Sequence, residues 1–502
     1  MKPREPEKIA TGLPGLDEIL RGGLPARRTY LIRGPSGSGK TTLGLQFALE
    51  GVRRKEKVLY VMLTETGGEL REVMASHGWS PRGLHVQESV EGPDILMKEA
   101  ESTLFQPAEL ELGETVRSIV ELVREQKPSR VVVDPLSELR VMAAEPMRFR
   151  MQFLALKQIF SEVGATALLL EESPYLSSAC EHLENVAHGV IALEQHSPAY
   201  GPDRRRIRVE KIRGSRVHSG FHDSEIMTGG MVIYPRAIDL EKAAKPSFEL
   251  LSTGLSKLDA MLGGGLEGGS KVLVLGQTGS GKSSLLAKLA HSLTSAGIKS
   301  SIFLFDESSS LFIRRSEGLG ISLRPALQAG ELSIVQVDPG EMSPGRLVHE
   351  VVTAVRSRRV GAVVLDSLDG LSRSMYDEPL FSVRLRELFA WLSRRGVTTL
   401  ASLPRSGSSA RGAELSYFAD TIVLLRHWQR DLELQKSVTV LKRRGGEIEP
   451  SVRELILSPH GISIGERLRQ PIWPPPPAPP LDGWTEKGGE RSSSEEQRDA
   501  PS

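Results

Sequence analysis

The chain carries two closely similar glycine-rich octapeptides. GPSGSGKT occupies Gly34–Thr41, and GQTGSGKS occupies Gly276–Ser283. The sequence before each copy repeats as well, since TGLPGLDEILRGGL precedes the first and TGLSKLDAMLGGGL precedes the second at the same offset. At a slightly shorter offset, RVVVDPLSEL matches GAVVLDSLDG and VEKIRGS matches VLKRRGG. Self-similarity over this length predicts two homologous halves with the same fold.

The repeat divides the 502 residues into parts. We predict an N-terminal domain over 1–240, a C-terminal domain over 241–468, and a tail over 469–502 whose Pro, Ser and charged residues predict disorder. Within each half, apolar runs such as RTYLIRG, KVLYVML and RVVVD alternate with segments of helical spacing. This pattern predicts the α/β class, with a mostly parallel sheet that helices cover on both faces.

The composition limits the location and the partners. The formal net charge is +1, so no global field draws the chain to nucleic acid or to an anionic membrane. Cys180 is the single cysteine, which excludes an internal disulfide and fits a reducing compartment. The first residues lack the apolar segment of a secretory signal, and no run of about 18 apolar residues is present. We expect a cytoplasmic protein without a membrane span.

Each octapeptide is expected to follow a strand and to precede a helix. Backbone N–H groups of such a loop surround a phosphate chain, and the helix N-terminus adds the positive end of its dipole. Glycines let the loop curl tightly, and Lys40 and Lys282 would reach the β- and γ-phosphates. We therefore predict that both loops bind ATP. The predicted binding residues are Gly34, Pro35, Ser36, Gly37, Ser38, Gly39, Lys40, Thr41 and Thr42, and Gly276, Gln277, Thr278, Gly279, Ser280, Gly281, Lys282, Ser283 and Ser284.

Hydroxyl and carboxylate groups near the loops predict a magnesium ion that binds with the nucleotide. Thr41 and Ser283 would each place a hydroxyl on Mg²⁺. Asp134 and Asp366 each end an apolar run and would hold the metal or its water. The alternative for each aspartate is an ordinary strand-terminal residue in a turn.

Hydrolysis also needs a group that orients the attacking water or accepts its proton. The second half has adjacent Asp306 and Glu307 after an apolar strand, and the first half has Thr64 and Glu65 at the matching positions. Because successive strand residues point to opposite faces, we expect one position of each pair to face the γ-phosphate. If it is the first position, the N-terminal half has a hydroxyl where a carboxylate belongs. If it is the second, both halves keep Glu.

Two short basic segments recur near the ends of the halves. Lys211 and Arg213 lie in KIR, and Lys442 and Arg444 lie in KRR. Alternate residues on a strand share a face, so each pair could stabilise charge on a phosphoryl group, in cis or from a neighbouring subunit. The alternative is a solvated edge strand. A third basic run, Arg204–Arg206, is interpreted as a solvated face or a solvated rim of a hairpin.

Together these motifs resemble the KaiC group of RecA-type ATPases, over nearly the whole chain outside the tail. The resemblance implies two tandem RecA-like P-loop domains and a two-tiered homohexameric ring with ATP between subunits. It implies that Glu65, Asp306 and Glu307 are catalytic carboxylates, and that the basic pairs of the KIR and KRR segments act on the neighbouring subunit's nucleotide. Thr64 and Pro135 depart from the family pattern, which has Glu and Ser there.

The resemblance also implies a candidate phosphosite. The clock protein of the group phosphorylates itself on adjacent Ser and Thr, which correspond here to Ser416 and Tyr417. Autophosphorylation of Ser416 is therefore an open expectation, against the alternative of a loop hydroxyl without a role. A two-site cycle, and with it a circadian timer, is not expected.

Three classes of function follow from these features. The first is a ring ATPase whose nucleotide state controls an unidentified signalling partner, with or without Ser/Thr autokinase activity in the second half. The second is an ATP-gated scaffold with little turnover, which Thr64 favours for the first half. The third is a RecA-like DNA-binding ATPase with Pro404–Gly412 as a channel loop. That loop has two arginines and no aromatic residue for base stacking, so a nucleic-acid partner is disfavoured.

Overall fold

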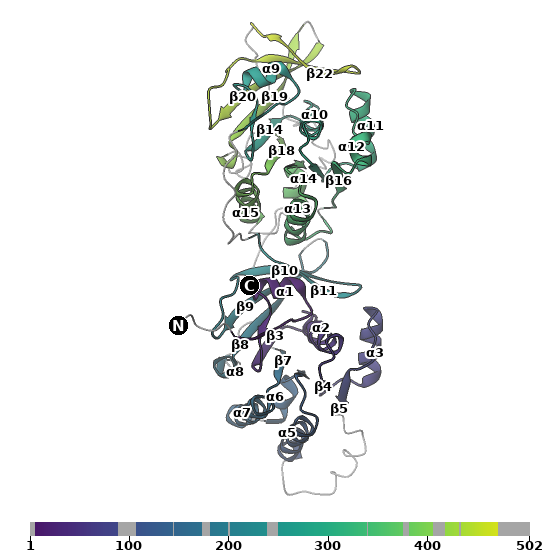
Figure 1. Cartoon of the computed structure of the whole chain (residues 1–502), viewed down its shortest axis with the longest axis vertical. Coiled ribbons are helices and arrows are strands. Elements are labelled where there is room, and N and C mark those ends of the chain that lie inside the picture. Colours follow the sequence, from purple (N-terminus) through teal and green to yellow (C-terminus); the bar gives the residue numbers. More distant parts are fainter. Residues whose placement is uncertain are drawn as a thin grey trace, which may run out of the picture.

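The computed structural model describes residues 6–88, 107–143, 145–172, 181–198, 201–237, 249–338, 340–374, 381–404, 417–430 and 433–469. Figure 1 shows two similar halves stacked along the long axis, each built around its own sheet. Two mostly parallel sheets flanked by helices confirm the predicted α/β class. The candidate phosphosite Ser416 and the tail from residue 470 onward lie outside the described residues.

The sheet of the first half has nine strands in the order β11-β10-β9-β8-β3-β7-β6-β4-β5. Strands β8 to β5 of this order are parallel, and β9, β10 and β11 extend the sheet in antiparallel fashion. The bounds are β3 Thr29–Gly34, β4 Val58–Met62, β5 His85–Glu88, β6 Arg130–Asp134, β7 Thr166–Glu172, β8 Gly189–His196, β9 Arg204–Ile212, β10 Phe221–Met227 and β11 Gly230–Tyr234.

The second sheet repeats this topology in the order β16-β15-β17-β18-β14-β19-β20-β21-β22, with β20, β21 and β22 antiparallel. The bounds are β14 Lys271–Gly276, β15 Ser300–Leu304, β16 Leu332–Gln336, β17 Ala362–Asp366, β18 Thr398–Pro404, β19 Thr421–Arg430, β20 Glu433–Arg443, β21 Arg453–Ser458 and β22 Gly461–Arg467. Each half also has a small two-stranded sheet near its start, made of β1 Lys8–Ile9 with β2 Leu24–Pro25, and of β12 Leu250–Leu251 with β13 Leu266–Glu267.

Helices cover both faces of each sheet, and the middle residues of the central strands are apolar. In β3, Tyr30 and Ile32 pack on one face while Leu31 packs on the other, as the two-residue period of a strand requires. On the first face lie α1 Pro14–Ile19, α2 Lys40–Arg53 and α3 Gly67–Ser76, and on the second α5 Pro107–Gln126, α6 Ser137–Ala143, α7 Pro146–Val163 and α8 Glu181–Val186. The second half matches this with α9 Ser256–Met261, α10 Lys282–Ser295, α11 Ser309–Gly318 and α12 Arg324–Gln328 on one face, and α13 Pro344–Arg358, α14 Leu368–Ser374 and α15 Phe381–Arg394 on the other. No helix in the described ranges is long and apolar enough to cross a membrane.

The two halves meet where the β10–β11 hairpin of the first contacts the N-terminus of α13 in the second (Figure 1). Asp223 Oδ2 accepts a hydrogen bond of 2.7 Å from the Gly345 backbone N–H and pairs with Arg384. Glu225 accepts hydrogen bonds from the Ser343 hydroxyl at 2.8 Å and from Arg346 at 3.2 Å. The first half thus places two carboxylates at a helix N-terminus, where the macrodipole favours negative charge.

Asp223→Ala is expected to destabilise the chain by about 3 kcal/mol, because it leaves the largely buried Arg384 guanidinium without its carboxylate partner. Urea denaturation monitored by intrinsic fluorescence would measure the change. The matched control is Glu454→Ala at the corresponding position of the β21–β22 hairpin, with an expected effect of about 0.5 kcal/mol or less. Equal effects of the two variants would mean that the junction adds no stability.

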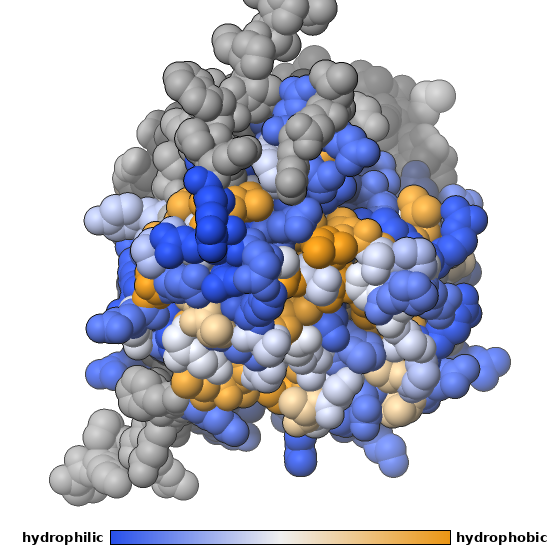
Figure 2. Space-filling model, turned by 90° about the horizontal axis from the view of Figure 1, so that it is seen from above, coloured by the Kyte–Doolittle hydropathy of each residue, from blue (hydrophilic) through white to orange (hydrophobic). Residues whose placement is uncertain are grey.

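The β21–β22 hairpin lies at the opposite end of the molecule from the first half (Figure 1). Ile456 of β21 is 40% exposed there, and Leu434 of β20 is 64% exposed. Figure 2 looks onto this end and shows hydrophobic residues in small groups between hydrophilic ones.

Candidate active sites

Each glycine-rich loop joins the central strand of a sheet to a buried helix. The first loop follows β3 and ends where α2 begins at Lys40, so the free N–H groups of the helix start at the loop. Gly37 and Gly39 have φ of 76° and 96°, values that favour glycine. A Cβ on Gly39 would lie 2.4 Å from Met231 Cε, and Ile226 contacts the same place. The second loop repeats this backbone, since Gly279 and Gly281 have φ of 79° and 100°.

The two loop lysines lie over their own loops. Lys40 Nζ donates hydrogen bonds to the carbonyls of Gly34 at 2.9 Å and Pro35 at 2.8 Å. Lys282 Nζ donates to the carbonyls of Gly276 and Gln277, both at 2.9 Å. Burial lowers the pKa of both ammonium groups. Each cation therefore lies at the concave side of a loop, where an anion would replace the carbonyl oxygens as its partner.

The strand-end aspartates lie beside the loops. Asp134 is 9% exposed and accepts a 2.7 Å hydrogen bond from the Tyr60 hydroxyl. Burial raises the pKa of Asp134, and hydrogen bonds from Tyr60 and Thr41 lower it. In the second half the Ser402 hydroxyl donates to Asp366. A threonine hydroxyl in contact with a carboxylate is a set of hard oxygen donors, which fits the Mg²⁺ that accompanies a nucleotide.

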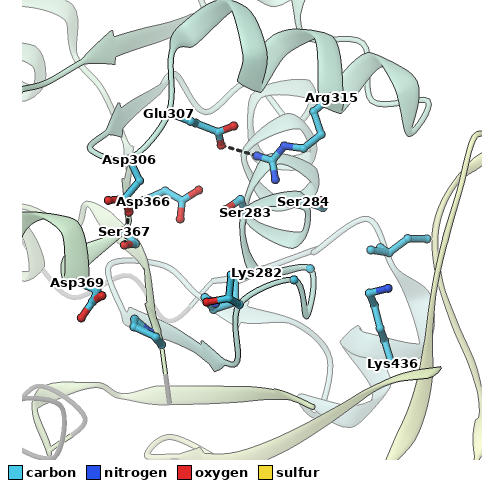
Figure 3. Close-up of a pocket in the computed structure, with 15 residues that line it drawn as sticks. Lys282, Ser283, Ser284, Asp306, Glu307, Arg315, Asp366, Ser367, Asp369 and Lys436 are labelled. Atoms are coloured by element: carbon cyan, nitrogen blue, oxygen red, sulfur yellow. Dashed lines mark hydrogen bonds and ion pairs between the residues drawn. The ribbon is translucent and has the colours of Figure 1, made fainter. Parts of the chain in front are cut away.

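A pocket of about 640 Å³ opens over the second loop. Its lining includes both Asp306 and Glu307, which Figure 3 shows on the same side of the pocket. The expectation that only one position of the pair faces the site is wrong for this half. The strand β15 already ends at Leu304, so the alternation of a strand does not extend to these residues. The lining also includes the loop and helix residues Thr278, Gly279, Gly281, Lys282, Ser283 and Ser284, together with Asp366, Ser367, Asp369 and Pro404.

The two carboxylates of this pocket have different partners. Asp306 Oδ2 accepts a hydrogen bond of 2.5 Å from the Ser367 hydroxyl. Glu307 Oε1 forms an ion pair of 2.6 Å with Arg315 of α11 (Figure 3). Burial raises the pKa of Glu307 and Arg315 lowers it, while Asp366 and Asp306 raise it further.

The predicted basic pairs lie far from the loops of their own half. Lys211 Nζ donates to the Glu184 carbonyl at 2.5 Å, and Arg213 Nη2 donates to the Asn185 carbonyl at 2.6 Å, at the end of α8. Strand β9 runs antiparallel to β8, so Lys211 lies opposite Val190, near the start of β8. This is the end of the strands that is farther from the first loop. At about 3.3 Å per residue, Lys211 is some 20 Å along β9 from the residues that contact that loop. The cis alternative is therefore excluded for this pair.

The second half repeats this arrangement. Lys442 Nζ and Arg444 Nη2 both donate to the Tyr417 carbonyl, at 3.3 and 3.0 Å. Arg444 also lies 3.7 Å from Asp420.

Comparison with known proteins agrees with this geometry. The model of the KaiC ATPase family matches residues 9–238 and again 251–469. The chain belongs to the KaiC family of ATPases. It is 29% identical to the circadian clock protein KaiC3 of Synechocystis sp., over 92% of either chain. It is 26% identical to the circadian clock oscillator protein KaiC of Parathermosynechococcus lividus, over 92% of this chain and 86% of that one, and 26% identical to that of Parasynechococcus marenigrum, over 91% and 90%. This family membership makes the chain an ATP-binding, KaiC-like ATPase.

The two sites of this KaiC-family chain are not equivalent. Glu65 is half-buried, and burial raises its pKa, with further rises from the carboxylates of Asp134 and Glu69. The position that corresponds to Arg315 is Val73, so no arginine of α3 pairs with Glu65 as Arg315 does with Glu307. Thr64 is exposed. The peptide bonds Asp134–Pro135 and Asp366–Ser367 are both cis.

The KaiC-family sites include two basic residues that the sequence interpretation missed. Arg205 Nε donates to the Gly37 carbonyl at 3.1 Å, and Lys436, at the matching position of β20, lines the second pocket (Figure 3). The solvated face or rim predicted for Arg204–Arg206 is therefore wrong: Arg204 is 8% exposed, and Arg205 contacts the loop. A sequence signal for these two residues exists: Arg205 and Lys436 each lie six positions before the lysine of the KIR or KRR segment. This correspondence is visible only when the two halves are aligned.

The Glu307–Arg315 pair predicts a pH dependence. A carboxylate that acts on water must be ionised, so turnover at the second site is expected to fall as the pH drops through the raised pKa of Glu307. Because Arg315 lowers that pKa, Arg315→Ala should move the acidic limb of the kcat profile to higher pH. The profile is measured by phosphate release in a Lys40→Ala background. An unmoved limb would mean that Glu307 does not control the titration.

Proposed function

We propose that this protein is an ATP-hydrolysing ring whose nucleotide state controls a signalling partner. The observation that carries the proposal is the distance of each basic pair from the loop of its own half. Each pair lies at the end of its strand that is farther from the loop, Lys211 and Arg213 at the end of β9 and Lys442 and Arg444 at the end of β20. A cation pair in that place contributes to phosphoryl transfer only if it meets the nucleotide of another subunit, in a head-to-tail interface that closes into a ring.

The roles of the remaining groups follow from their contacts. The loop N–H groups and the lysines Lys40 and Lys282 bind the phosphates, and Thr41 and Ser283 act with Asp134 and Asp366 to hold Mg²⁺. Mg²⁺, when bound, neutralises charge on the phosphate oxygens. Glu65, Asp306 and Glu307 are the proposed catalytic carboxylates, which orient the attacking water or accept its proton.

The assembly is tested by measuring particle mass with and without ATP and Mg²⁺. We expect a homohexamer of two tiers in the presence of nucleotide. A monomer that nucleotide does not affect would remove the proposal for the basic pairs. The cytoplasmic location, the signalling partner and the absence of a nucleic-acid partner stay predictions.

Autophosphorylation of Ser416 is the finer part of the proposal. The test is incorporation of labelled phosphate from ATP, compared with Ser416→Ala. The alternative of an ATP-gated scaffold is favoured for the first half by one observation, Thr64 in place of a carboxylate. Single-turnover hydrolysis by Lys282→Ala protein distinguishes a slow enzyme from a scaffold there.

A further inference from the structure

The first site lacks both members of a hydrogen-bonded pair that the second site contains. Asp306 and Ser367 bond to each other in the second pocket. The corresponding residues of the first half are Thr64 and Pro135, neither of which carries a carboxylate. A second carboxylate at the first site, besides Glu65, would therefore come from another element.

Strand β7 places a carboxylate at the required edge. Glu172 lies opposite Gly34 in the parallel register of β3 and β7, as Pro404 lies opposite Gly276 in the second half. Pro404 lines the second pocket. Glu172 therefore occupies, in the first half, a position that borders the nucleotide pocket in the second.

The end of β7 is held by an arginine. Glu171 is fully buried and pairs with Arg140 of α6 at 3.0 Å. Arg140 Nη2 also donates to the backbone carbonyl of Glu172 at 3.1 Å. These two contacts of Arg140 hold the backbone at Glu172 in place. The Glu172 side chain is exposed and has no hydrogen bond or ion pair with any other residue in the described ranges.

The register also places Glu172 close to the loop lysine. Lys40 Nζ donates to the carbonyl of Gly34, the residue opposite Glu172 in the pairing of β3 and β7. The Lys40 ammonium marks where the β- and γ-phosphates bind. Glu172 thus lies at the phosphate end of the predicted nucleotide site.

We propose that Glu172 supplies the proton-accepting carboxylate of the first site, in the role proposed for Asp306 in the second. The inference rests on the proposed hydrolysis of ATP. As the water oxygen bonds to the γ-phosphorus, the bond to the ADP oxygen breaks and ADP leaves with the electron pair. Glu172 accepts one proton of the water and releases it to solvent, which completes the conversion of ATP and water to ADP, phosphate and a proton.

The test uses full-length protein with Lys282→Ala, so that turnover reports on the first site. In this background Glu172→Gln should lower kcat about 100-fold, as loss of a general base does, and leave the dissociation constant for a non-hydrolysable ATP analogue within about twofold. Adding Thr64→Asp to Glu172→Gln should recover at least about tenfold of the loss, because it restores a carboxylate at the position of Asp306. The matched control is Glu172→Gln with Lys40→Ala, whose second-site turnover should not change.

Three results would overturn the inference. These are unchanged kcat in Glu172→Gln, a loss of analogue binding as large as the loss of kcat, and no turnover by Lys282→Ala protein with Glu172 intact. A wild-type chain that hydrolyses no ATP would instead end the proposed function itself. An unchanged thermal unfolding midpoint and the recovery by Thr64→Asp exclude misfolding as the cause of a loss.

Discussion

Lys282→Ala is expected to lower ATP turnover at the second site about 100-fold or more. The Lys282 ammonium lies over the loop that would hold the phosphates, and removing one such group that stabilises developing charge typically costs about 10²–10³ in rate. Steady-state phosphate release measures the loss. The activity that remains in this variant is the contribution of the first site.

Two further variants make the result specific. Lys40→Ala should remove the first-site activity in the same way and leave that of the second. Lys288→Ala, further along α10, should leave both unchanged, since this side chain does not line the pocket. A Lys282→Ala protein with full turnover would show that the pocket over the second loop is not where hydrolysis occurs.

Arg444→Ala is expected to lower second-site turnover about 10³-fold, the effect of losing an arginine that stabilises phosphoryl transfer. ATP binding to the loop should change much less, because Arg444 lies at the Tyr417 carbonyl rather than at the loop of its own half. Arg213→Ala should act likewise on the first site. Turnover and analogue binding are measured on the same preparations.

Mixing variants decides whether the cation acts between subunits. Arg444→Ala and Lys282→Ala proteins, both with Lys40→Ala, should each be nearly inactive alone. In a random one-to-one mixture, about a quarter of the head-to-tail interfaces would join an intact loop to an intact cation. We expect activity to return on mixing. A mixture as inactive as its components would contradict action in trans.

The sequence was sufficient for those features that depend on short range or on the repeat. The loops, their lysines and the strand-end aspartates lie where the octapeptides and apolar runs predict, because a strand, a tight glycine turn and a helix are fixed by local residues. The equal topology of the sheets follows from the duplication.

The features that the sequence did not predict depend on register between distant strands. Arg205 reaches Gly37 only because β9 folds back along β8, and Glu172 lies beside the first loop only because β7 pairs with β3. Asp306 and Glu307 both line one pocket because β15 ends before them. Single-chain patterns report spacing along a strand, and they carry no information on which strand is its neighbour.

The β10–β11 hairpin contacts both the first glycine-rich loop and the second half. Met231 and Ile226 press against Gly39 of the first loop, while Asp223 and Glu225 grip the start of α13. A displacement of that loop on nucleotide binding would therefore act directly on the contact between the two halves. In the second half, Leu457 of β21 lies against Gly281 of the second loop in the same manner. No helix comes after the β21–β22 hairpin in the described residues. Within one chain, such a hairpin contact therefore connects the first loop to the second half, and the hairpin at the second loop makes no matching contact with a further domain in the described residues.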